Sequence, residues 1–302
     1  MARAKSIFIS LLLTLCAAAY AQTCEDGFRS INHELGEACI PQAPSRIVSL
    51  NPMVTDNLVA LGIEPIAIAT FNGVDFTSYE YMTAYLADTP IVGRFPEPNL
   101  EAVLQLTPDL IIGRARDIGE NYNNLSAIAP TVALADQSTP EAWLRSVTDV
   151  LGIDPSERLD AYDATMRTYA EQLPEDIQVE TAAFLRVQPT RIRLYSASRL
   201  GGPILYTKLG LQMPNVVADI AEGESLIDVS LELLPSLADV DHIFLLDQST
   251  EDDPAAIFDS PLWEALPAVQ AGNVYPASRD IWINLGILAS EEVAQSIVDA
   301  LR

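Results

Sequence analysis

Four arginines, far apart in the sequence, are the side chains best suited to bind an anionic ligand. A guanidinium presents a planar fork of donors and keeps its charge even when partly desolvated. Arg116 lies just beyond the carboxyl end of the strand predicted at residues 109–113, where open α/β sheets bind their ligands. Arg199 follows a predicted strand and precedes Gly201–Gly202, a loop position open to a cleft. The other two candidates are Arg94 and Arg114.

The charge balance of the chain supports this interpretation. The formal net charge is −25, and Lys208 is the only lysine beyond residue 21. Such acidity argues against nucleic acids and anionic membrane surfaces as partners. An acidic protein that concentrates its few arginines is a candidate to bind an anion. A salt-adapted organism or arginine-rich codon usage would also explain the composition, and any one arginine could instead form a surface ion pair.

Aromatic residues offer a second kind of contact. Tyr122, Tyr195 and Trp282 could stack on an aromatic chelator or pack against its apolar rim, but each could equally belong to the core. Trp143 and Trp263 lie in helical patterns and are expected to be packing residues.

Enzymatic functions are disfavoured by the motifs that the sequence lacks. It contains no G-x-S-x-G, P-loop, G-x-G-x-x-G or H-E-x-x-H pattern. Its only histidines are His33 and His242, too few for the His-rich cleft of a zinc or manganese receptor. His242 lies in a predicted buried strand, where a hydrogen-bonded core role is expected. We predict no catalytic residues and no resident cofactor.

The elements that must position these side chains alternate as in α/β proteins. In the first half, strands are predicted at 46–50, 65–69, 109–113 and 131–134, and helices at 55–61, 99–106, 119–128 and 140–151. In the second half, strands are predicted at 181–187, 191–196 and 241–247, and helices at 203–209, 230–237 and 290–301.

Residues 154–174 are predicted to form one long helix between the two halves. Asp154 is placed to cap it, Pro155 suits its first position, and Pro174 ends it. One apolar stripe recurs at three- and four-residue steps: Leu159, Tyr162, Met166, Tyr169 and Leu173. The pattern alone fits a crossover helix in one sheet as well as a strut between two lobes. A strut should pack its stripe across both lobes.

The N-terminus predicts export. Residues 1–21 have the two cations, the apolar run and the small-x-small ending of a secretory signal peptide. Lipidation of Cys16 is not expected, because the small residue that usually precedes an acylated cysteine is missing.

Two cysteines, Cys24 and Cys39, remain after cleavage. In an exported chain they most simply pair, stapling a hairpin over residues 22–43. A zinc site with His33 is the alternative, but two sulfurs and one imidazole are too few ligands for structural zinc.

The two halves share a phrase. NLEAVLQLTPDLII at 99–112 matches SLELLPSLADVDHIFLL at 230–246 with small length differences, each a capped helix with Leu-Glu followed by a buried strand. This match suggests two related lobes.

Longer stretches resemble a known family. PSRIVSLNPMVTDNLVALG at 44–62, VGRFPEPNLEAVLQLTPDLIIGRARD at 92–117, LYSASRLGGPILYTKLGL at 194–211 and SRDIWINLGILAS at 278–290 are similar to iron–siderophore substrate-binding proteins of ABC transporters, nearest the catecholate branch. The resemblance implies two Rossmann-like α/β lobes, at 44–153 and 175–302, joined by a backbone helix at 154–174 with the ligand cleft between them. It also implies limited closure of the cleft.

The resemblance implies a function and site residues. The protein would be a periplasmic, monomeric receptor that captures a ferric siderophore and delivers it to an inner-membrane ABC permease dimer. Arg116 and Arg199 match arginines that contact the siderophore, and Tyr195 and Trp282 lie in matching segments. Cobalamin or haem binding by the same fold is the first alternative, and an exported α/β enzyme the second.

Departures from the family pattern affect the ligand expected. Gln248 stands where a third arginine is usual, and Glu222 and Ile283 replace a histidine and a tyrosine that can ligate iron. Unless Glu222 ligates iron, the protein has no residue at the family's iron-ligating positions. These changes favour a ferric complex that is less charged or fully hexadentate, such as a hydroxycarboxylate or mixed type.

Permease docking is implied for two acidic residues. In this family one acid on each lobe meets arginines of the permease, and the matching positions are Asp56 and Glu232. An acidic residue in the first turn of a helix could instead simply favour the helix dipole.

Overall fold

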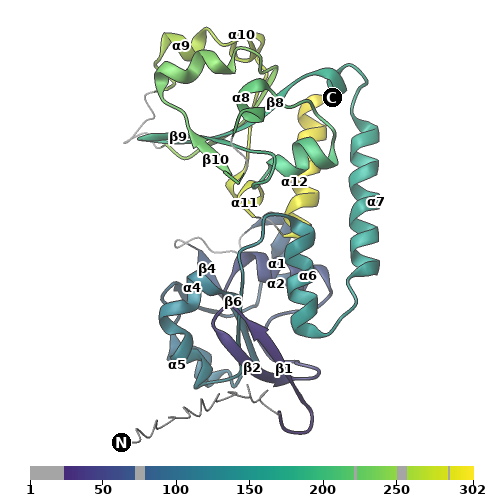
Figure 1. Ribbon diagram of the computed structural model, residues 1–302, viewed down its shortest axis with the longest axis vertical. Coiled ribbons are helices and arrows are strands. Elements are labelled where there is room, and N and C mark those ends of the chain that lie inside the picture. Colours follow the sequence, from purple (N-terminus) through teal and green to yellow (C-terminus); the bar gives the residue numbers. More distant parts are fainter. Residues whose placement is uncertain (1–23, 72–78, 221–222, 250–256, 285) are drawn as a thin grey trace, which may run out of the picture.

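The computed structural model describes residues 24–71, 79–220, 223–249, 257–284 and 286–302. It contains a small hairpin and two five-stranded sheets, each with its own covering helices. Figure 1 shows the two sheets in separate lobes, one above the other, with a long helix running along one side of both. The predicted signal peptide and the predicted site residue Glu222 lie outside the described residues.

The first sheet is wholly parallel and has the order β5-β4-β3-β6-β7. Its strands are β3 (Ile47–Ser49), β4 (Ala67–Phe71), β5 (Ile91–Phe95), β6 (Leu110–Arg114) and β7 (Thr131–Leu134). β3, β6 and β7 are buried throughout. Continuous burial explains why they are aliphatic runs instead of alternating patterns, since helices cover both faces of a parallel sheet.

The helices of the first lobe begin where the sequence supplies caps. The Asn51 side chain accepts the N–H groups of Met53 and Val54 at the start of α1, and Thr139 caps α6. Gly152 ends α6 with φ of 70°, a conformation that favours glycine. The helices are α1 (Pro52–Ala60), α2 (Glu80–Leu86), α3 (Leu100–Gln105), α4 (Ala115–Ile118), η2 (Gly119–Asn121), α5 (Tyr122–Ser126) and α6 (Pro140–Leu151).

The second sheet is mixed and has the order β10-β9-β8-β11-β12. β8, β11 and β12 are parallel, and β9 and β10 continue the sheet as antiparallel strands. The strands are β8 (Ala182–Gln188), β9 (Arg191–Tyr195), β10 (Leu226–Asp228), β11 (His242–Asp247) and β12 (Val274–Pro276). The helical segments are η3 (Ile177–Val179), η4 (Pro203–Lys208), α8 (Asn215–Ala218), η5 (Leu231–Leu237), α9 (Pro261–Glu264), α10 (Pro267–Ala271) and α11 (Arg279–Trp282).

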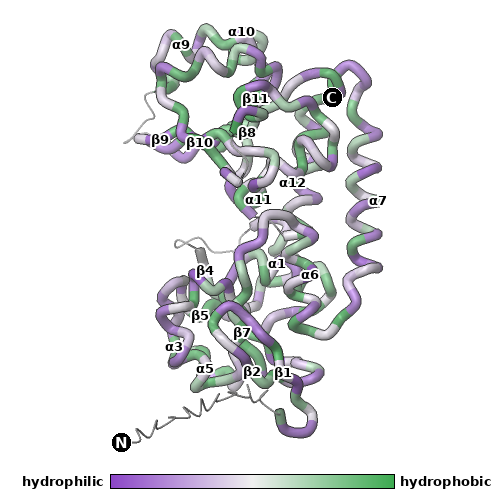
Figure 2. The backbone as a smooth tube through the Cα atoms, viewed as in Figure 1, coloured by the Kyte–Doolittle hydropathy of each residue, from purple (hydrophilic) through white to green (hydrophobic). Residues whose placement is uncertain are grey.

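Helix α7 (Ser156–Gln172) follows the first lobe in sequence and runs up beside the second (Figure 1). It alternates between polar and apolar segments along its length, as expected for a helix with one apolar side (Figure 2). Of the predicted stripe, Tyr169 is half-buried and four members are buried: Leu159, Tyr162, Met166 and Leu173. They belong to one continuous core that also holds residues of both sheets.

The C-terminal helix α12 (Ile287–Leu301) lies between α7 and the lobes (Figure 1). It packs against α7, α11 and η4 and also against α1, α2 and α6 of the first lobe. The stripe of α7 therefore contacts mainly α12 and η4, and α12 carries the packing through to the first lobe. The sequence pattern did not indicate this intermediate layer.

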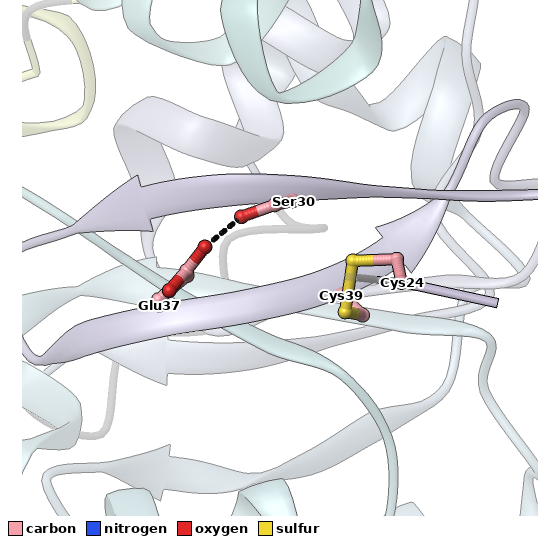
Figure 3. Close-up of a disulfide and its surroundings, with 4 residues drawn as sticks. All are labelled: Cys24, Ser30, Glu37 and Cys39. Carbon is pink, nitrogen blue, oxygen red and sulfur yellow. Dashed lines mark hydrogen bonds between the residues drawn. A yellow bond between two sulfur atoms is a disulfide. The ribbon is translucent and has the colours of Figure 1, made fainter. Parts of the chain in front are cut away.

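The N-terminal hairpin consists of β1 (Phe28–His33) and β2 (Gly36–Pro41). The predicted disulfide is confirmed, because Cys24 and Cys39 are bonded, and a Ser30–Glu37 hydrogen bond crosses the strands (Figure 3). The Glu34 N–H donates to the carbonyl of Ala133, so the hairpin covers the edge strand β7.

Most predicted elements agree with the structure, and the differences have local causes. β7 and α6 have the predicted bounds. The segment at 203–208 is a π-helix and that at 231–237 a 3₁₀ helix containing Pro235. Asp154 accepts the backbone N–H of Ser156, the first residue of α7. Short elements such as α2, β5, β10 and β12 were not predicted, because they are too brief to show a period.

Within the residues described, no helix is both long and apolar enough to cross a membrane.

Candidate functional site

A cleft of about 280 Å³ lies between the two lobes. Its first-lobe residues follow the carboxyl ends of the parallel strands, where α/β sheets bind ligands: Asn51, Pro52, Met53, Tyr79, Arg114, Arg116 and Asp136. The second lobe contributes Arg186, Arg193, Tyr195, Arg199, Leu200, Leu226, Asp280, Ile283 and Asn284. Five of the seventeen lysines and arginines of this acidic chain thus line one cleft.

Arg114 is held by a buried acid. Its Nε and Nη2 atoms lie 2.9 and 2.8 Å from the two carboxylate oxygens of Asp117, a bidentate ion pair. Asn51, the cap of α1, also donates to Asp117 at 2.9 Å. The Arg114 side chain is only 5% exposed. Arg114 therefore stabilises the rim of the first lobe, and most of its donors are occupied by the protein.

Arg116 is the more exposed of the two first-lobe arginines that line the cleft. Its side chain is 60% exposed, and its Nη1 lies 3.4 Å from Asp136. Asp136 follows β7 and also accepts from Arg114 Nη1 at 3.2 Å. Exposed ion pairs of this kind are weak. A ligand of higher negative charge can therefore replace Asp136 beside Arg116.

Arg186 on β8 and Arg193 on β9 lie directly opposite each other in the antiparallel ladder. Like charges at such positions repel and destabilise a sheet. Both side chains line the cleft, so an anionic ligand placed there would relieve the repulsion.

Neighbouring side chains orient these two arginines. Arg186 Nε donates to Gln248 Oε1 at 2.5 Å. Arg193 Nε lies 3.4 Å from Asp228, its neighbour in register on β10. Gln248 does not line the cleft, so its predicted role as a direct ligand contact is replaced by support for Arg186. A neutral partner leaves the full charge of Arg186 directed at the cleft.

Arg199 projects from a loop built around aromatic packing. It makes no ion pair with any residue that the structure describes. A Cβ on Gly201 would lie 2.5 Å from the Trp282 ring, and one on Gly202 would lie 2.1 Å from the Ser196 carbonyl oxygen. Only glycine at both positions allows the loop to lie against Trp282 and bring Arg199 to the rim.

The opposite corner of the cleft carries Tyr79 and Asp280. Burial raises the pKa of Asp280, and the neighbouring Arg279 opposes that shift. Burial and the Asp280 charge raise the pKa of Tyr79 to about 12, so its hydroxyl is protonated at neutral pH. This corner offers a hydroxyl and amides beside one carboxylate, in contrast to the arginines elsewhere.

The comparison with protein families decides the identity of the chain. The family model for periplasmic binding proteins matches residues 47–280. The chain belongs to this family. The predicted resemblance to the iron–siderophore substrate-binding proteins of ABC transporters is confirmed by its relatives and structural neighbours. Because the family is one of binding proteins, the alternative of an exported enzyme is set aside.

Three similar proteins illustrate this relationship. The Fe(3+) dicitrate-binding periplasmic protein FecB of Escherichia coli is 29% identical over 299 residues, which cover 97% of this chain and 94% of FecB. The Fe(3+)-citrate-binding protein YfmC of Bacillus subtilis is 28% identical over 281 residues, covering 89% and 85%. Staphylococcus aureus SirA complexed with staphyloferrin B superposes with a TM-score of 0.74 at 27% identity, covering 90% and 98%.

The structure of this periplasmic binding protein shows which of the predicted site residues line the cleft. Arg114, Arg116, Tyr195 and Arg199 line the cleft as expected. Arg94 does not, because it is 63% exposed and pairs with Glu97. Trp282 is 1% exposed and stacks on Phe244, so it is a core residue.

The structure also places the remaining aromatic residues and His242. Tyr122 contacts His33 of the hairpin through its hydroxyl at 3.1 Å and does not line the cleft. Tyr195 is 2% exposed and stacks on Phe184 with a centroid distance of 5.0 Å, so it forms the floor of the cleft. Trp143 and Trp263 are buried, as predicted. His242 is a satisfied core residue, bonded to Glu180 and Tyr275.

The prediction that Asp56 docks on a permease is wrong. Asp56 is fully buried, and its carboxylate accepts the N–H groups of Leu288 and Ala289 at 2.9 and 3.0 Å. It therefore caps α12 from α1. A Cβ on Gly286 would lie 2.0 Å from the Asp56 carboxyl carbon, so the chain passes too close for any other residue.

Arg186 and Arg193 were missed, although each had a signal. Each arginine lies between apolar residues of a strand: Arg186 between Leu185 and Val187, and Arg193 between Ile192 and Leu194. A charge inside a strand is costly unless it faces water or a ligand. Arg186 and Arg193 therefore supply two cleft cations that the sequence analysis did not count.

Proposed function

We propose that this binding protein captures an anionic ferric chelate whose outer surface is rich in carboxylates. The observation that carries the proposal is the cross-strand pair of Arg186 and Arg193 at the cleft, with Arg116 and Arg199 at its rims. Four guanidinium forks can meet several carboxylates at once, each by paired hydrogen bonds. In this reading the chelator supplies the iron ligands and the protein recognises the charged exterior.

The names of relatives support the same class. FecB and YfmC are named as ferric citrate-binding proteins. Citrate is a hydroxycarboxylate, the type that the departures from the catecholate pattern also favour. A second relative of Escherichia coli, 27% identical over 288 residues, is named as a ferric enterobactin-binding protein. Because the named relatives bind both kinds of chelator, our choice of a carboxylate-rich chelator rests on the charge of the cleft.

Delivery to a membrane permease completes the proposed function. The predicted signal peptide would export the chain, and a monomer would then carry its ligand to an inner-membrane ABC permease dimer. Glu232 is exposed in the first turn of η5. The phrase shared by the lobes pairs it with Glu101, exposed in the first turn of α3. We assign the two docking acids to Glu101 and Glu232 in place of Asp56.

Ligand binding is the direct test. The purified protein is titrated with ferric citrate, a ferric catecholate, ferrichrome, haemin and cobalamin while tryptophan fluorescence is recorded. Trp282 lies under the Arg199 loop, so occupancy should change its emission. We expect saturable binding of ferric citrate that weakens with added salt, because the contacts are ionic. Tight binding of cobalamin or haemin without any response to ferric chelates would overturn the proposal.

A further inference from the structure

Asp136 is an acid placed where an anionic ligand should bind. It follows the carboxyl end of β7, lines the cleft, and its side chain is 38% exposed. It contacts both first-lobe arginines that line the cleft, Arg114 at 3.2 Å and Arg116 at 3.4 Å. Arg114 also has a separate bidentate pair with Asp117, which involves its Nε and Nη2 atoms. The partner that depends on Asp136 is therefore Arg116.

The two faces of the cleft differ in how their arginines are compensated. On the first-lobe face two acids, Asp117 and Asp136, balance Arg114 and Arg116, and Asp136 is the nearer acid to Arg116. On the second-lobe face Arg193 pairs with Asp228, but Arg186 is held by the neutral Gln248 and Arg199 has no acidic partner in the described chain. The second-lobe face, with three arginines near Asp228 and Asp280, therefore keeps more net positive charge than the first-lobe face, where two acids balance two arginines.

We propose that Asp136 is a specificity-determining residue: it occupies the fork of Arg116 in the empty protein and competes there with a carboxylate of the ligand. This inference rests on the proposed function of the cleft. A ligand with enough negative charge displaces Asp136 and gains Arg116. A neutral or singly charged chelate gains less from a contact with Arg116 than the loss of the Asp136–Arg116 pair costs. Such a chelate therefore contacts the second lobe alone. Asp136 thereby sets the minimum negative charge that a ligand must carry to contact both lobes.

The test removes the charge of Asp136 and keeps its shape. In Asp136→Asn, ferric citrate prepared in excess citrate should bind more tightly, on the order of tenfold at low salt, because one like charge has left the cleft. The gain should shrink as salt is raised. Titration with ferrichrome, a neutral ferric hydroxamate, should give the same response for both proteins. Asp136→Glu, which restores the charge, should return the affinity for ferric citrate toward the wild-type value.

A double-mutant cycle separates competition from a general charge effect. In an Arg116→Gln background the Asp136→Asn gain should largely disappear, because the contested fork is gone. Asp88→Asn is the matched control, since Asp88 is exposed before β5 at the amino edge of the sheet, away from the cleft, and makes the same change in net charge. It should leave ferric citrate affinity unchanged.

The outcomes distinguish this inference from the function on which it rests. If the wild-type protein binds no ferric chelate, the proposed function fails. If it binds ferric citrate and Asp136→Asn binds equally or more weakly, Asp136 supports Arg116 instead of competing for it, and the inference is overturned. An equal gain with and without Arg116 would overturn it too. Circular-dichroism melts establish that each variant is folded, and Asp136→Ser serves as a second neutral variant.

Discussion

At the scale of single residues, the site consists of cations that the protein compensates unequally. Arg114 is bound by Asp117 and has little left to offer a ligand. Arg186 and Arg193 face each other across two strands, an arrangement that costs stability in the empty protein. Such strain at a functional position is relieved when a ligand supplies the opposite charge.

Replacing Arg186 should separate binding from stability. Arg186→Gln should weaken ferric citrate binding by about 2 kcal/mol, because a directed charge contact is lost. Its free energy of unfolding should be unchanged or slightly higher, since the repulsion with Arg193 disappears. Isothermal titration and urea denaturation measure the two quantities. Arg94→Gln is the control, because Arg94 lies outside the cleft and pairs only with Glu97. Wild-type affinity in Arg186→Gln would contradict this account of the site.

At the scale of elements, the junction of α1 with α12 holds the two lobes together. Asp56 on α1 accepts two N–H groups at the start of α12. Burial nevertheless raises the pKa of Asp56 to about 7, although the N–H groups of Ala289 and Leu288 oppose the shift. Tyr81 and Glu291 are the other titratable groups that influence it.

The raised pKa of Asp56 predicts a pH-dependent stability. Between its ordinary value of 3.8 and about 7, the folded protein holds a proton that the unfolded chain has lost. The contribution of Asp56 to stability is therefore greatest below pH 4 and declines as the pH rises to about 7. Relative to Asp56→Asn, the wild-type Tm should fall across this window, as thermal melts at each pH would show. Parallel Tm profiles for the two proteins would contradict the prediction.

At the scale of the whole molecule, the two lobes are tied along one side. Lys208 of η4 pairs with Asp163 of α7 at 2.8 Å and also with Glu141 of α6, so one lysine joins both lobes to the long helix. Arg158 of α7 pairs with Glu291 of α12 at 2.9 Å. We therefore expect closure to be confined to small movements about this side.

The proposed docking acids are Glu101 on the first lobe and Glu232 on the second. Helices that follow parallel strands begin at the carboxyl edge of the sheet, so Glu101 at the start of α3 lies on the cleft side of its lobe. Glu101→Lys and Glu232→Lys should leave ferric citrate affinity unchanged, because neither lines the cleft. Each should reduce stimulation of ATP hydrolysis by the cognate permease in proteoliposomes, roughly tenfold, through lost charge pairing. Glu64→Lys, an exposed acid before β4 at the amino edge, is the control. Full stimulation by the double variant would remove these residues from the interface.

Local patterns were sufficient for much of the fold. The buried strands β6, β7 and β11, the capped helix α6 and the disulfide-stapled hairpin follow from residues close together in the chain. For the site, Arg116 and Arg199 could be predicted because each follows the end of a strand, Arg116 in the short helix α4 after β6 and Arg199 in the loop after β9. Arg186 and Arg193 could not be paired in advance, because antiparallel register decides which strand residues face each other.

The sequence by itself determined the alternation of strands and helices, the long central helix and the surplus of arginine over lysine, since periodicity and composition need no knowledge of distant contacts. Only the tertiary structure decided which charges remain available to a ligand. Asp117 occupies Arg114, Asp136 competes for Arg116, and Asp56 is buried under α12, 232 residues away along the chain. Each outcome depends on burial and on partners brought together by packing, and the same residue types would behave differently in water.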